Sequence, residues 1–249
     1  MNAYTVLSLV PRLLDIHGDA QNAQALAARA RWAGRDARVI AIDSNEGLPL
    51  LDELDPDAIV IGSGFDTDAA EVLGVLEGTA DRLRGWVAGG VPLLAVGLGW
   101  ELLSAETEIE AGRPMRGIGL FSGRFSAGER SSGPTVLDSE WGRIVGYGYH
   151  TRDYQPGEGE RPLGAVRAGI GNLGPARGEA VEGTVRGSAI GTSLRGPILA
   201  RNPVLADALL GESNAPAETG ESAAHRIADE YAKRTNSRVL AELGLTSQQ

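Results

Sequence analysis

The stretch "VPLLAVGLGWELLSAE", residues 91–106, joins a short apolar run, a Gly-Leu-Gly turn and an amphipathic segment. That order predicts a buried strand over 91–96, a sharp turn, and a helix over 99–106. Many hydrolases hold their nucleophile at a strand–turn–helix junction of this kind. Here the turn offers Gly97, which has no side chain. The sequence therefore predicts the backbone of a nucleophile site without its nucleophile.

The composition excludes several kinds of chemistry. The chain has 249 residues and no cysteine, so it forms no disulfide, thiolate metal site or cysteine nucleophile. Its only lysine, Lys233, lies far from the glycine-rich turns, which argues against Schiff-base chemistry and a phosphate-loop lysine. A net charge of −10 argues against a nucleic-acid partner.

No apolar stretch reaches the roughly 18–20 residues that a membrane span needs. The apolar N-terminus lacks the basic leader of a signal peptide. We therefore expect a cytoplasmic protein with no membrane span.

Predicted strands and helices alternate through the first part of the chain. This alternation is typical of an α/β fold with a doubly wound, mostly parallel sheet flanked by helices, in flavodoxin-like layers. The predicted strands are 4–10, 37–42, 57–61 and 91–96, and the predicted helices are 20–33, 68–88 with a break near Gly78, and 99–106.

The pattern changes after residue 112, where short apolar runs alternate with glycine-rich turns. These runs predict hairpin additions and edge strands in the C-terminal half. Residues 211–222 are interpreted as a flexible connection, and 223–243 as a terminal helix with Ile227 and Tyr231 on one face. No second core is apparent, so we predict one domain over 1–249.

Two glycine-rich loops are the first candidates for a binding site. Gly62-Ser63-Gly64 and Gly97-Leu98-Gly99 each follow a predicted strand, and ligands of parallel sheets bind at the carboxyl ends of the strands. The alternative is that both loops are only tight turns. Three isolated histidines (His17, His150 and His225) form no cluster, so we expect no metal and no cofactor. Asp66 and Asp68 are interpreted as helix-cap and first-turn charges.

Five segments in this order resemble class I glutamine amidotransferase domains of the cobyric acid synthase type. Within that family they are most similar to GatD-type subunits, which work with the ligase MurT on the peptidoglycan precursor lipid II. The segments are "LLDIHGDAQNAQALAARARWAG" (13–34), "DAIVIGSGFDTD" (57–68), "PLLAVGLGWELLS" (92–104), "GRIVGYGYHTRDY" (142–154) and "AIGTSLRGPILARNPVLADALL" (189–210).

The resemblance implies where the functional residues of the family fall. The catalytic cysteine falls on Gly97 and the catalytic histidine on Arg195. The Glu-Asn of a G-F-E-N-H segment is replaced by Gly148 and Tyr149, and His150 is kept. Further matches are Asp19 with the third catalytic residue, Arg130 with a substrate-contacting arginine, and the Gly62, Ser63, Gly64 loop with the oxyanion donors. Leu98 is a further ligand-binding candidate beside the turn.

These replacements remove the chemistry of glutamine hydrolysis. Gly97 supplies no nucleophile, and the guanidinium of Arg195 remains protonated and is no general base. The resemblance then implies a non-catalytic subunit in a heterodimer with a MurT-like ATP-dependent ligase. That ligase would act on the α-carboxyl of the D-glutamate in lipid II, with free ammonia or an amino acid as the amine.

Three alternatives remain open at this point. The chain is an enzyme with changed chemistry that uses Asp19 and His150, a stand-alone binding or regulatory protein for a small anion, or an active glutaminase with an unrecognised site. We also expect a small amino acid or another anion to bind Arg195 and Arg130 in the volume vacated at Gly97. The competing interpretation is that Arg195 turns outward or pairs with Glu101.

Overall fold

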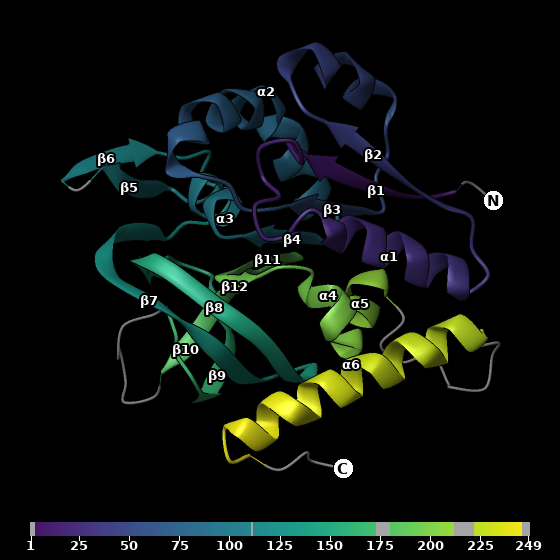
Figure 1. The fold of residues 1–249 in the computed structure, drawn as a ribbon. Coiled ribbons are helices and arrows are strands. Elements are labelled where there is room, and N and C mark those ends of the chain that lie inside the picture. The colour runs from purple at the N-terminus through teal and green to yellow at the C-terminus, as the bar shows by residue number, and fades with distance from the viewer. Residues whose placement is uncertain (1–2, 111, 173–179, 212–221, 246–249) are drawn as a thin grey trace.

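The computed structural model describes residues 3–110, 112–172, 180–211 and 222–245. In this part of the chain one mixed sheet of twelve strands lies between helices on both faces (Figure 1). The main path through the sheet is β12-β8-β7-β9-β10-β11-β4-β3-β1-β2, with β5 and β6 beside β7.

The first half of the chain forms the parallel part of this sheet, as predicted. Pairing is parallel between β1 and β2, β1 and β3, and β3 and β4. The strands β3 and β4 are apolar and buried along their whole length because helices cover both of their faces. The elements are β1 (Tyr4–Leu9), α1 (Gln21–Trp32), β2 (Ala37–Ile42), η1 (Asn45–Glu53), β3 (Ala58–Ile61), η2 (Asp66–Asp68), α2 (Ala69–Ala88), β4 (Leu93–Val96) and α3 (Leu98–Leu103).

The second half adds antiparallel strands, which confirms the predicted hairpin additions. The strands β7 and β8 form a long antiparallel ribbon, and β11 returns to pair in parallel with β4. The elements are β5 (Glu106–Glu110), β6 (Arg113–Arg116), β7 (Arg124–Ser139), β8 (Gly142–Gln155), β9 (Arg161–Ala168), β10 (Val181–Arg186), β11 (Ala189–Thr192), β12 (Leu194–Arg195), α4 (Ile198–Arg201), α5 (Pro203–Leu210) and α6 (Ala223–Glu242).

The helix α6 crosses the lower face of the molecule in Figure 1. Arg29 of α1 anchors it with a buried guanidinium that binds Asp207 of α5 and Asp229 of α6, with N–O distances of 2.7 and 2.6 Å. Farther along α6, Leu240 packs on Val136 and Val145 of the ribbon. The helix therefore covers a sheet face that would otherwise be apolar and exposed.

Two predicted helices have different bounds in the structure. The expected break at Gly78 is wrong: α2 is continuous, and Gly78 allows the close approach of η1, since a Cβ there would lie 2.5 Å from Leu48 Cδ1. The helix after the Gly97 turn ends at Leu103, because the carbonyls of Leu102 and Leu103 accept hydrogen bonds from the amides of Ile118 and Phe121.

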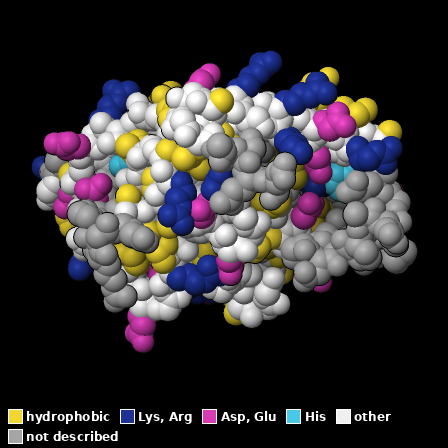
Figure 2. Space-filling view, turned by 90° about the horizontal axis from the view of Figure 1, so that it is seen from below, with side chains coloured by type: hydrophobic (Ala, Val, Ile, Leu, Met, Phe, Trp, Pro, Cys, Tyr) yellow, Lys and Arg dark blue, Asp and Glu magenta, His cyan; other side chains and the backbone are white. Residues whose placement is uncertain are grey.

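The predicted terminal helix is confirmed as α6, but Ile227 and Tyr231 lie on its exposed side. Most of the connection predicted over 211–222 lies outside the described residues. Figure 2 shows basic and acidic side chains interspersed on the face seen from below, without a continuous basic surface among the described residues. In the described part of the chain, no helix is long and apolar enough to span a membrane.

Candidate functional site

The site is built around the turn between β4 and α3. Gly97 occupies this turn with φ 50° and ψ −118°, a conformation that side-chain-bearing residues rarely adopt. Its amide donates to the carbonyl of Thr192 on β11, at 2.9 Å, and the amide of Gly99 donates to the carbonyl of Gly62 after β3, at 3.1 Å. These two bonds hold the turn against the carboxyl ends of the neighbouring strands, where the sequence predicted the crevice.

Arg195 fills the volume that a side chain at position 97 would occupy. A Cβ built on Gly97 would lie only 1.2 Å from Arg195 Nη1. The guanidinium is held by neutral acceptors: Nε and Nη2 donate to the carbonyl of Tyr149 at 3.1 and 3.0 Å, and Nη1 donates to Ser63 Oγ. The expectation that the vacated volume forms a pocket is therefore wrong, because a guanidinium already lies there.

Ser63 lies in the loop where the resemblance placed oxyanion donors, and its side chain binds the turn itself. Its buried hydroxyl oxygen accepts from the amide of Leu98, at 3.2 Å, as well as from Arg195. The Leu98 amide is the group that would stabilise an oxyanion at this turn. In this structure the Leu98 amide donates instead to the hydroxyl of Ser63.

Buried acids surround Arg195. Asp19 is fully buried, its Oδ1 accepts from the amide of Gly196 at 2.8 Å, and burial raises its pKa. Glu182 is also fully buried with a raised pKa, and it accepts hydrogen bonds from Thr192 and Ser193. Burial lowers the pKa of Arg195, and the carboxylates nearby oppose that shift.

An ion-pair network that the sequence did not predict lies beside the turn. Arg152 Nη1 binds the buried carboxylate of Glu101 at 2.9 Å, and Arg152 Nη2 binds Asp66 at 2.6 Å. Asp66 is therefore an ion-pair partner, and neither it nor Asp68 makes a side-chain cap bond. The predicted alternative of an Arg195–Glu101 pair is wrong, since Glu101 pairs with Arg152. The only signal in the sequence was that Glu101 lies one helical turn after Gly97.

A cleft of about 490 Å³ opens in front of the turn, at the carboxyl ends of the strands. It brings together most of the residues that the sequence indicated, but Asp19, Gly62 and His150 do not line it. His150 is buried with a pKa lowered by burial, and its Nδ1 makes no hydrogen bond among the described residues. The lining residues are Ile16, His17, Ser63, Gly64, Phe65, Asp66, Thr67, Leu98, Glu101, Arg130, Tyr149, Thr151, Arg152 and Arg195.

The ring of Tyr149 lies near two of the arginines that line this cleft. The Arg130 and Arg195 guanidinium carbons lie 5.4 and 5.5 Å from the centroid of its ring. At the preceding position, a Cβ on Gly148 would lie 2.9 Å from Thr135 Oγ1, so a larger residue there would displace the Thr135 side chain. Among the described residues, no group of three or more His, Cys, Asp or Glu could hold a metal ion.

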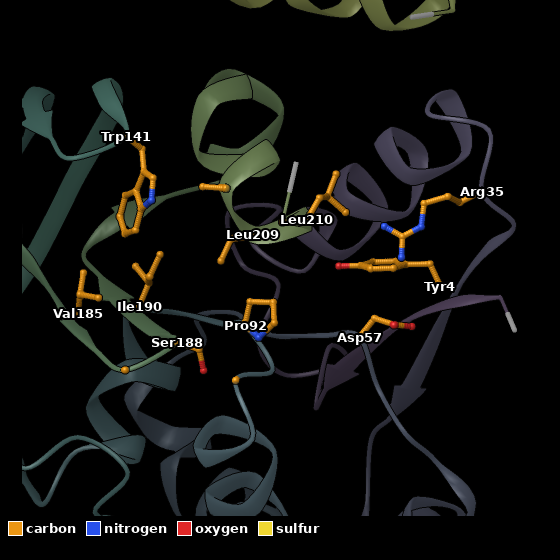
Figure 3. Close-up of a pocket in the computed structure, with 14 residues that line it drawn as sticks. Tyr4, Arg35, Asp57, Pro92, Trp141, Val185, Ser188, Ile190, Leu209 and Leu210 are labelled. Atoms are coloured by element: carbon orange, nitrogen blue, oxygen red, sulfur yellow. The ribbon is translucent and has the colours of Figure 1, made fainter. Parts of the chain in front are cut away.

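A second groove, of about 380 Å³, lies at the opposite end of the strands. Figure 3 shows its apolar floor of Pro92, Ile190 and Leu209 between Trp141 and Tyr4, with the Arg35 guanidinium over the Tyr4 ring. The groove lies at the amino ends of β1, β3, β4 and β11, away from the Gly97 turn. It takes no part in the site described above.

The strand, the glycine turn and the facing Gly-Ser-Gly loop form the elbow of a class I glutamine amidotransferase fold, and Gly97 and Arg195 stand where the sequence resemblance placed the nucleophile and the base. The chain belongs to the CobB/CobQ-like glutamine amidotransferase domain family, whose model matches residues 5–203.

Individual relatives agree with this membership. The chain is 29% identical over 213 residues to the lipid II isoglutaminyl synthase (glutamine-hydrolyzing) subunit GatD of Staphylococcus aureus, covering 84% of each chain. The fold is similar to a crystal structure of a glutamine amidotransferase, with a TM-score of 0.52, 18% identity and coverage of 82% and 98% of the two chains. It is also similar to the glutaminase domain of Trypanosoma brucei CTPS, with a TM-score of 0.51, 13% identity and coverage of 89% and 98%.

Proposed function

We propose that this chain is a GatD-type subunit that lacks glutaminase activity and works with a MurT-like ATP-dependent ligase. The ligase would amidate, or otherwise ligate an amine to, the α-carboxyl of the D-glutamate in lipid II. The relative in Staphylococcus aureus is a glutamine-hydrolysing subunit of a lipid II isoglutaminyl synthase, which supports the assignment of partner and substrate. A cytoplasmic location follows from the need of such a ligase for ATP.

The observation that carries the loss of activity is the position of Arg195. Glutamine hydrolysis in this fold needs a nucleophile over the turn and a base beside it. At this turn a guanidinium lies 1.2 Å from where the first side-chain atom of residue 97 would be. The Leu98 amide binds Ser63 Oγ. The nucleophile and the base are therefore missing, and the Leu98 amide is already hydrogen-bonded to Ser63 Oγ.

Ammonia release from glutamine tests the first half of this proposal. The purified chain, alone and with its ligase, is expected to release no ammonia above the rate of the buffer, with the Staphylococcus aureus GatD as the positive control. Gly97→Cys is expected to remain inactive, because a thiol at this position still has no base. Turnover that persists through a second purification contradicts the loss of activity.

Complex formation tests the second half. Co-expression with the MurT-like ligase of the same cell, followed by size-exclusion chromatography, is expected to give one peak that contains both chains. Two separate peaks at micromolar concentration would refute the subunit role while leaving the ammonia result unchanged.

A further inference from the structure

We propose that the groove at the amino ends of the strands binds a free α-amino acid with an apolar side chain. The charged head of the ligand binds Arg35 and Asp57 at one end of the groove, and its side chain packs on the floor toward Trp141. The groove lies at the end of the sheet opposite the Gly97 turn, so this site is independent of the proposed function.

The first observation is the shape of the groove. Its volume of about 380 Å³ lies within the range of about 300–1,000 Å³ that is typical of small-molecule sites. Its walls come from β1, the β7–β8 turn, the β10–β11 hairpin and the end of α5, which are distant in the sequence. Three of the lining side chains, Tyr4, Ile190 and Leu209, are buried and held by the core. The groove is therefore a preformed concave surface.

The second observation is the polarity of the floor. Pro92, Ile190 and Leu209 present only carbon atoms from their side chains (Figure 3). Ser188 lies beside them, and its hydroxyl is directed to the protein itself, since it donates to the carbonyl of Val91 at 2.8 Å. A polar ligand side chain would lose its hydrogen bonds to water on this floor without replacing them. The floor therefore favours an aliphatic or aromatic side chain.

The third observation is a pair of opposite charges at the Tyr4 end of the groove. The guanidinium carbon of Arg35 lies 4.3 Å from the centroid of the Tyr4 ring. Asp57 Oδ2 accepts from the amide of Thr5 at 2.7 Å, which fixes the carboxylate, and Oδ1 makes no hydrogen bond or ion pair with any described residue. Figure 3 shows the Tyr4 hydroxyl directed into the groove, with Arg35 and Asp57 on either side of the ring. One end of an otherwise apolar groove thus carries a cation, an anion and a hydroxyl.

These charges match the head of an α-amino acid. Its carboxylate accepts from the guanidinium of Arg35, its ammonium donates to Asp57, and the Tyr4 hydroxyl can bond to either group. A simple amine would meet Asp57 but be repelled by Arg35, and a simple carboxylate would meet Arg35 but be repelled by Asp57. The groove therefore selects a zwitterion with an apolar tail over either singly charged analogue.

Calorimetric titration of the full chain tests the proposal. The probes are leucine, phenylalanine and tryptophan, with serine as the polar amino acid. The matched analogues of leucine are 3-methylbutylamine, which lacks the carboxylate, and 4-methylpentanoate, which lacks the amino group. At least one apolar amino acid is expected to bind, and to bind about tenfold or more tightly than serine and than its own two analogues.

Variants of the groove locate the site. Asp57→Asn and Arg35→Gln are each expected to weaken binding about fivefold, as for an ion pair at a partly exposed site. Ala208→Trp places a large side chain in the groove and is expected to abolish binding. Asp55→Asn and Arg113→Gln are the matched controls, because both residues are exposed and lie outside the groove, and neither change should affect binding.

Three outcomes would overturn the proposal: no apolar amino acid binds at millimolar concentration, a singly charged analogue binds as tightly as its parent, or Asp57→Asn leaves the affinity unchanged. Asp57 and Arg35 are exposed, so their variants keep the test valid even if Ala208→Trp does not fold. Each of these outcomes is independent of ammonia release and of complex formation, which test the proposed function.

Discussion

Replacing Gly97 by alanine provides a direct measure of how tightly Arg195 fills the turn. An alanine at φ 50° and ψ −118° is strained by about 1–3 kcal/mol. Its Cβ would also overlap Arg195 Nη1, so the guanidinium has to leave Ser63 and Tyr149. Loss of such charge-assisted hydrogen bonds costs about 1.5–3 kcal/mol. We therefore expect Gly97→Ala to lower the free energy of unfolding by about 2.5–6 kcal/mol.

A double-mutant cycle separates the two contributions. In an Arg195→Ala background the guanidinium is absent, and Gly97→Ala should cost only the backbone strain and the displacement of Ser63 Oγ, which lies 2.5 Å from the built Cβ. The coupling energy between the two positions is then about 1.5–3 kcal/mol. Urea unfolding followed by far-UV circular dichroism and by tryptophan fluorescence gives the four free energies, and Trp100, buried in α3, reports on the turn.

Gly99→Ala is the matched control for this cycle. A Cβ on Gly99 would lie 2.5 Å from the backbone oxygen of Gly62, so its cost does not depend on Arg195. Its coupling to Arg195→Ala should be near zero. If Gly97→Ala and Arg195→Ala are additive within about 0.5 kcal/mol, the guanidinium does not occupy the turn and the argument for a filled site is wrong.

Three further outcomes are expected. Arg29→Leu should destabilise the chain by about 2–3 kcal/mol in urea unfolding, because it leaves two half-buried aspartates without their cation. Burial raises the pKa of Glu182 in the folded state, so the parent loses free energy of unfolding as the pH rises from 4.5 toward that raised pKa. Glutamine does not ionise, so Glu182→Gln should stabilise the chain relative to the parent by an amount that grows over this pH range. Gly97→Cys with Arg195→His should bring back measurable ammonia release only in the double variant, as a glutaminase assay of both single variants and the pair would show.

Each of these outcomes has a control. For Arg29, the exposed Arg113→Leu should cost less than about 0.5 kcal/mol, and an equal loss in both variants would contradict the anchoring role. For Glu182, a stability difference that stays constant between pH 4.5 and 8 would show that the carboxyl titrates normally. For the turn, activity in Gly97→Cys alone would show that another residue acts as the base.

The sequence predicted the parallel half of the fold because its signals are local. Apolar runs such as 57–61 and 91–96 are short, lack charges and end in glycine turns, and the structure confirms them as β3 and β4. The extent of the β7–β8 ribbon was not predicted. Its residues are mixed in polarity, since one face packs on the core and the other is exposed along much of its length.

The candidate site was predicted in part. The glycine loops and Arg195 were named from the sequence, and the structure brings Ser63, Leu98, Arg130 and Arg195 into one cleft. The role of Tyr149 as the acceptor for Arg195, and the Glu101–Arg152–Asp66 network, depend on contacts between distant segments. No local spacing encodes such contacts, so the direction in which Arg195 points could not be predicted.

The parallel pairing of β11 with β4 sets the order in which the chain can fold during synthesis. The strand β4 leaves the ribosome early, yet its partner β11 follows only after the whole β7–β8 ribbon has been made. Until Thr192 emerges, the nascent chain carries an open edge along Leu93–Val96, four apolar residues that are buried in the finished protein. Closing that edge joins segments distant in sequence, which makes it a slow step and leaves the unfinished chain exposed to association through β4.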